Sequence, residues 1–138
     1  MTYATQADLV DRFGEQELVE LADRDGDGAI DTAVVAAALA DADTTIDAYV
    51  GKRYGLPLAA TPALLRRLAG DLARHFLYKD DPTEAVQAAR DAAIRMLRDI
   101  ASGSAVLDVA GAEPARDGQA VLTDGPARTF SRTALEGF

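Results

Sequence analysis

Apolar residues recur at helical spacing along most of the chain, so the sequence predicts an all-α protein. The longest such stripe follows Asp31, where apolar positions recur mostly three or four residues apart: Val35, Leu39, Ala42, Ile46, Tyr49 and Val50. This spacing places the side chains on one face of a helix. We therefore expect a long helix that is capped by Asp31, continues to Tyr54 and is buried along one face.

The end of this long helix is expected where glycine and proline interrupt the pattern. Gly55 can adopt the left-handed conformation just past the last turn. Pro57 blocks continuation of the helix and pushes Leu56 out of helical geometry. The sequence therefore predicts a loop from Gly55 onward.

Two shorter helices are predicted before the long one. The first is capped by Thr5, carries Asp8 in its first turn and breaks at Gly14, and its inward residues are Leu9, Val10 and Phe13. The second runs from Glu15 to about Ala22 and buries Leu18, Val19 and Leu21.

Two longer helices are predicted after it. One has Thr61 as cap and Pro62 at its first position, and it runs to about Tyr78 with Leu64, Leu65, Leu68, Leu72 and Phe76 buried. The other is started by Asp81, Pro82 and Glu84, and its stripe ends at Gly103 after Val86, Ala89, Ala93, Leu97 and Ile100. Residues 1–103 are thus predicted to form a bundle of four to five helices.

Residues 104–138 have a different composition, in which glycine, proline and β-branched residues replace the alanine-rich pattern. The turn at Asp124 and Gly125 is compatible with a short β-hairpin, and an extended C-terminal arm is the alternative. Three large apolar residues of this tail require a groove, either on their own bundle or on a neighbouring copy: Phe130, Leu135 and Phe138.

Composition narrows the classes of protein. A chain of 138 residues suits one ordinary domain. No apolar run approaches the roughly 20 residues that span a bilayer, and no secretion signal is present, so we expect synthesis in the cytoplasm and no membrane partner. The absence of cysteine excludes disulfides, thiolate metal sites and a cysteine nucleophile.

Charge is distributed unevenly along the chain. The net charge is −9, yet residues 1–47 carry twelve acids and two bases, whereas residues 48–103 carry six acids and nine bases. Opposite patches of this kind suit a head-to-tail contact between copies, while the alternative is that both are solvated faces. The overall negative charge argues against wrapping DNA.

The segment DRDGDGAID is the candidate metal site. Aligned with a calcium-binding EF-hand loop, its expected ligands are Asp23, Asp25, Asp27, the Ala29 carbonyl and Asp31, with Gly28 at the sharp turn. Val34 occupies the position where a bidentate glutamate normally completes the shell. The segment is therefore either a weakened Ca2+ site or an Asp-Gly loop in which Asp31 caps the next helix.

No catalytic motif is present in the sequence. His75 is the only histidine and lies on the border of an apolar face, as a structural residue would. No glycine loop has P-loop or dinucleotide-binding spacing. We expect that the protein is not an enzyme.

Basic residues gather around the loop at residues 55–62: Lys52, Arg53, Arg66, Arg67 and Arg74. Total charge favours a protein partner, the acidic half of an adjacent subunit, over passing contact with DNA. Tyr54 is expected off the face of Tyr49, since five residues correspond to about 140° around a helix. It is either an interface residue or a packing residue at the helix end.

Three sequence segments carry a family resemblance: the opening YATQADLVDRFGEQELVELADRDGDGAID, the central IDAYVGKRYGLPL and the final RTFSRTALEGF. With them the chain resembles a family of small proteins from the head-morphogenesis genes of Mu-like phages and prophages. The resemblance implies a helical head-tail connector, a head-completion or neck protein that forms a homo-oligomeric ring between the portal and the tail.

These observations predict a structural virion protein of the phage neck, with itself, the portal and tail proteins as partners. The alternative is a calcium-binding regulatory or interaction module of EF-hand type. Apart from that possible Ca2+, no cofactor is expected.

Overall fold

The computed structural model describes residues 1–109, which form five α-helices and no β-strand. The helices are α1 (Gln6–Phe13), α2 (Glu15–Ala22), α3 (Thr32–Val50), α4 (Ala63–Leu77) and α5 (Glu84–Ser102). The all-α prediction is confirmed. The predicted hairpin or extended arm, with Phe130, Leu135 and Phe138, falls on residues that lie outside the described part of the chain.

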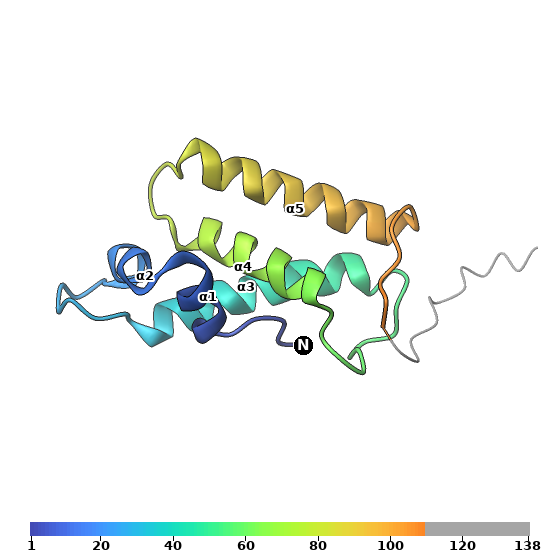
Figure 1. The fold of residues 1–138 in the computed structure, drawn as a ribbon, viewed down its shortest axis with the longest axis horizontal. Helices are drawn as coiled ribbons and strands as arrows, with labels where there is room; N and C mark the ends of the chain where they lie inside the picture. Colours follow the sequence, from blue (N-terminus) through green and yellow to red (C-terminus); the bar gives the residue numbers. More distant parts are fainter. Residues whose placement is uncertain (110–138) are drawn as a thin grey trace, which may run out of the picture.

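The three long helices form the body of the molecule. Helix α4 packs against both α3 and α5, and the short pair α1 and α2 lies beside the body (Figure 1). Small residues on the facing surfaces, Ala38, Ala42, Ala69 and Ala73, are buried and allow close helix approach. The largest fully buried side chains of the body include Ile46, Leu65, Leu72, Leu97 and Ile100.

Helix α1 begins with the cap that its sequence predicts. The Thr5 hydroxyl accepts the N–H of Asp8, and the Asp8 carboxylate accepts the N–H of Thr5. Gly14 has a φ of 92° and joins α1 directly to α2. The Thr5 cap, the break at Gly14 and the bounds of α2 are therefore confirmed.

The end of α3 differs from the prediction. The helix stops at Val50, and residues 51–54 continue as tight turns in which Tyr54 donates its N–H to the Val50 carbonyl at 2.9 Å. Gly55 does not adopt positive φ, so the expected left-handed stop is wrong. Asp31 does cap the start of the helix, since its carboxylate accepts the N–H of Ala33 at 3.1 Å.

Both later helix starts are displaced from their predicted caps. Pro62, with an extended ψ of 143°, is the N-cap of α4, so the Thr61 hydroxyl does not cap it. Thr83 caps α5 by accepting the Val86 N–H at 3.3 Å, two residues beyond the expected Asp81. At the other end, Gly103 takes the left-handed conformation with a φ of 88°.

The inward face of α4 is broader than the predicted stripe. Phe76 is 38% exposed, whereas Leu77 is buried. Because α4 contacts α3 on one side and α5 on the other, it buries two adjacent rows of side chains, and Phe76 falls at their edge.

The segment before α1 is bound to α3 by polar contacts. The Tyr3 hydroxyl donates to Asp47 at 2.5 Å, and the Tyr3 N–H donates to Asp43 at 3.0 Å. The amino group of Met1 pairs with Asp47 at 3.2 Å. No helix within residues 1–109 is both long and apolar enough to cross a membrane.

Candidate functional site

The acidic loop between α2 and α3 is closed by its own backbone amides. The Asp23 carboxylate accepts the N–H groups of Gly26, Asp27 and Gly28 at 2.8, 3.1 and 2.9 Å. Gly26 and Gly28 have φ values of 77° and 78°, which L side chains rarely adopt. These contacts shape the loop as an Asp-Gly turn.

Three of the five expected metal ligands come together. Carboxylate oxygens of Asp23, Asp25 and Asp27 lie within 4.8 Å of one another. Asp31 caps α3 instead, and Val34 is half-buried against the core. Among the described residues, the gathered carboxylates are these three, whereas a full calcium shell takes six to eight oxygens.

The pKa values of two loop carboxylates are shifted in opposite directions. The Gly28 N–H is the largest cause of the lowered pKa of Asp23. The pKa of Asp25 is raised, chiefly by its hydrogen bond with Asp23. Within residues 1–109, no cation forms an ion pair with either Asp25 or Asp27.

Tyr54 is not on the surface. It is 2% exposed, and its hydroxyl oxygen accepts the N–H of Leu107 at 2.8 Å. Residues 104–109, which follow α5, thus fold back onto the body, where Leu107 and Val109 are also buried. Of the two alternatives for Tyr54, the interface role is wrong and the packing role is the one observed, because the side chain packs inside its own chain.

The predicted basic cluster is divided among three places. Arg74 pairs with Glu17 of α2, and Arg66 and Arg67 line a hollow beside α1. Lys52 and Arg53 lie beyond the end of α3, where the Arg53 guanidinium covers Gly103 in the space that a Cβ would occupy.

Lys52 also lines a hollow of about 260 Å³ between the ends of α3 and α5, together with Tyr49, Arg98, Ala101 and Ser102. The Lys52 ammonium lies 5.5 Å from the centroid of the Tyr49 ring. No carboxylate of residues 1–109 pairs with Lys52 or Arg98. The sequence analysis missed Arg98, because nothing in its spacing indicates that the end of α5 faces Lys52.

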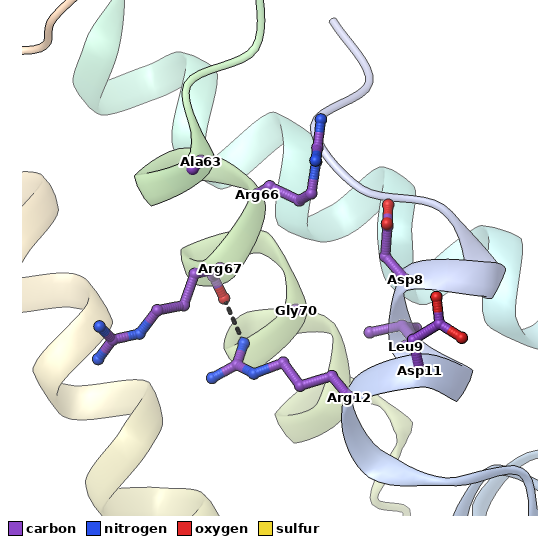
Figure 2. A pocket seen from close by; sticks show the side chains of 8 residues that line it. All are labelled: Asp8, Leu9, Asp11, Arg12, Ala63, Arg66, Arg67 and Gly70. Carbon is purple, nitrogen blue, oxygen red and sulfur yellow. Dashed lines mark hydrogen bonds between the residues drawn. The ribbon is translucent and has the colours of Figure 1, made fainter.

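The hollow beside α1, shown in Figure 2, has a volume of about 200 Å³ and contains both signs of charge. Arg12 donates to the carbonyl of Arg67 at 2.8 Å and to the carboxylate of Asp71 at 2.7 Å. Burial raises the pKa of Asp71, although Arg12 and two further arginines act in the opposite direction. This contact fastens α1 to α4, and the sequence analysis missed both residues.

A second polar contact joins the short helices to α4. The Phe13 ring lies between two guanidinium groups, with Arg12 at 4.9 Å and Arg74 at 4.5 Å from its centroid. Arg74 also pairs with Glu17. Arg12 and Arg74 therefore help to hold the two short helices against α4.

His75 is half-buried, and burial, followed by the nearby Arg90, lowers its pKa. Its ring contacts the ring of Phe76 edge-on at a centroid distance of 5.9 Å. These surroundings fit the structural role that the sequence predicts, since a lowered pKa keeps the imidazole neutral at neutral pH.

The two charged regions lie far apart. Figure 1 shows the 23–31 loop and α2 at one end of the long axis, and residues 51–62 with residues 103–109 at the other. The acidic loop and the Lys52–Arg98 hollow are therefore at opposite ends of one body.

Comparison with known proteins gives one family. The family model described as Bacteriophage Mu, Gp36 matches residues 3–123. The Mu-like prophage FluMu protein gp36 of Haemophilus influenzae is 31% identical over 137 residues, which cover 99% of this chain and 97% of that relative. Gene product J of Escherichia phage Mu is 38% identical over 104 residues, covering 75% of this chain and 74% of the relative.

Proposed function

Since the chain belongs to the Bacteriophage Mu Gp36 family of phage proteins, we propose that it is a structural protein of the virion. Its role is that of a head-completion adaptor in the neck, where copies form a ring between the portal and the tail. The observation that carries this proposal is a small helical body whose acidic 23–31 loop lies at one end of the long axis, while residues 51–62, which include Lys52 and Arg53, lie at the other. Such a body suits repeated contacts between copies.

The described residues also support a non-enzymatic role. The pKa shifts of Asp23, Asp71 and His75 have structural causes. Amide hydrogen bonds of the 23–31 loop lower the pKa of Asp23, and burial is the main cause of the shifts at Asp71 and His75. The Arg12–Asp71 and Arg74–Glu17 pairs join helices, so these charges support the fold. The partners of the protein are then its own copies, the portal and tail proteins.

Passing contact with DNA is part of the same proposal. The net charge of −9 disfavours tight binding to a duplex. If acidic surfaces line the bore of the ring, DNA slides through without adhering. Weak retention of duplex DNA on immobilised protein at low salt is the expected result, and strong retention that falls steeply with salt would favour a DNA-binding role.

The proposed neck role is tested by examining phage particles made without this protein. Phage carrying a nonsense codon in this gene are expected to yield filled heads that lack tails, as seen by electron microscopy. Supplying the protein from a plasmid should restore tailed particles, and mass spectrometry should detect the chain in them. Fully infectious particles without the chain would disprove the proposal.

A calcium-binding interaction module is the second candidate, favoured by the approach of Asp23, Asp25 and Asp27. Val34 at the twelfth position leaves the site without its bidentate ligand, so we expect affinity no tighter than about 10⁻⁴ to 10⁻³ M. Calorimetric titration with CaCl₂, with Asp25→Asn as control, measures it. Uptake at about 10⁻⁷ to 10⁻⁵ M, as in calcium sensors, would favour this second role.

A further inference from the structure

We propose that the acidic loop of one copy docks into the Lys52–Arg98 hollow of the next copy, so that the subunits of the ring join end to end. The inference rests on the proposed ring and names the surfaces that form its repeated contact. Asp25 and Asp27 are the carboxylates that enter the neighbour's hollow.

The first support is the pattern of unpaired charge. Among residues 1–109, Lys52 and Arg98 have no carboxylate partner, and Asp25 and Asp27 have no cationic partner. The two sets lie at opposite ends of the long axis, so one molecule cannot pair them with each other. A contact between two different patches on neighbouring copies pairs both.

The second support is the form of the two surfaces. The hollow of about 260 Å³ is lined by Tyr49, Lys52, Arg98, Ala101 and Ser102, and its two cations are the groups that it offers to a carboxylate. The loop is exposed, and the three amide contacts to Asp23 hold its shape. A preformed loop loses little conformational entropy when it docks.

A third support is crowding among the loop carboxylates. Carboxylate oxygens of Asp23, Asp25 and Asp27 lie within 4.8 Å of one another. An ammonium and a guanidinium from another copy relieve the repulsion between these like charges. Duplex DNA is the competing occupant of the hollow, and the following experiment separates the two.

Charge reversal tests the contact. Sedimentation velocity at low salt measures self-association of the 138-residue protein, of Asp25→Lys and of Lys52→Glu. Each variant alone should associate about tenfold more weakly than the natural chain, and an equal mixture of the two should recover association. Asp41→Lys and Lys79→Glu are matched controls at other exposed sites and should associate as the natural chain does.

Cross-linking gives a second measurement for weak association. The chain contains no cysteine, so Asp27→Cys with Ser102→Cys provides the sole thiols for a short bis-maleimide reagent. This double variant should give a ladder of covalent oligomers, whereas Asp41→Cys with Ser102→Cys should not. No ladder at high protein concentration and low salt, or no recovery on mixing, would disprove the contact.

Two further outcomes separate this inference from the proposed function. If Asp25→Lys and Lys52→Glu phages each form normal tailed particles that contain the protein, the end-to-end contact is wrong and the neck role stands. If Lys52→Glu instead abolishes salt-dependent retention of duplex DNA, the hollow is a DNA site and the inference is wrong.

Discussion

The body formed by α3, α4 and α5 and the amino-terminal region up to Ala22 are held in different ways. The body is packed through buried aliphatic side chains such as Leu65, Leu97 and Ile100. The amino-terminal region also buries Leu9 and Leu18, but its attachment includes Arg12–Asp71, Arg74–Glu17 and Tyr3–Asp47. The body is thus stabilised mainly by buried apolar area. The amino-terminal region also depends on polar and charged pairs, whose contribution to stability is lost when one member is removed or changes protonation.

The largest expected effect is in the body. Leu97→Ala removes a fully buried side chain and leaves a cavity, so the free energy of unfolding should fall by about 2–5 kcal/mol. Arg95→Ala, on the exposed face of the same helix, should change it by at most about 0.5 kcal/mol. Urea denaturation followed by circular dichroism measures both, and equal losses would contradict a buried face at Leu97.

An intermediate effect is expected where α1 meets α4. Arg12→Ala leaves the buried carboxylate of Asp71 without its partner at 2.7 Å and should cost about 2–3 kcal/mol. Asp71→Asn should cost less than about 1 kcal/mol at pH 7, because burial raises the pKa of Asp71 and the neutral amide avoids the burial of charge.

A double-mutant cycle isolates the pair. Arg12→Ala should cost at least about 1 kcal/mol less in the Asp71→Asn background, since no buried charge is then left unpaired. Additive losses would show that Arg12 acts through its contacts with Phe13 and the Arg67 carbonyl, independently of Asp71. Because the folded pKa of Asp71 is raised, its ionisation destabilises the fold as the pH rises through that pKa, and Asp71→Asn should therefore cost more below pH 3.8 than at pH 7.

A smaller effect is expected where residues 104–109 pack against Tyr54. Tyr54→Phe leaves the buried N–H of Leu107 without an acceptor and should cost about 1–2 kcal/mol. Tyr49→Phe is the matched control with a half-buried ring, and it should be close to neutral. Hydrogen exchange of the Leu107 amide should accelerate in Tyr54→Phe only.

The smallest effect concerns Tyr3. Burial, followed by the hydrogen bond to Asp47, raises the pKa of Tyr3 above its ordinary value of 10.0. Its contribution is therefore complete below pH 10 and is lost as the pH rises toward the folded pKa. Tyr3→Phe should cost about 1 kcal/mol at pH 8 and less at pH 11, as measured by urea denaturation. A constant difference between these two pH values would contradict the role of the hydroxyl.

The sequence predicted most of the body, because apolar residues at a period near 3.6 mark helices whatever their partners are. It also predicted the Thr5 and Asp31 caps, which depend on neighbours in the sequence. The later caps were displaced because proline, threonine and acidic residues offered several starts within three positions. Which of these residues caps α5 depends on the backbone conformation before the helix, and in the structure it is Thr83.

The contacts of the charged residues were not predictable in the same way. Arg12 and Asp71 are separated by 59 positions, and nothing in their spacing indicates a pair. Tyr54 was misplaced for a related reason. The predicted direction of its side chain assumed that the helix continues to Tyr54, whereas the helix ends at Val50. Its hydrogen-bond partner Leu107 lies 53 positions later in the sequence. In the 23–31 loop, by contrast, the approach of three carboxylates followed from local spacing.

The proposed contact between the acidic loop and the Lys52–Arg98 hollow would have a consequence for growth. Every copy added in this manner would leave one loop and one hollow unoccupied, so a straight row of copies would have no end point. A closed circle would require a fixed angle between successive copies or a template with a fixed number of binding sites. The number of subunits would then be set by that angle or by the template.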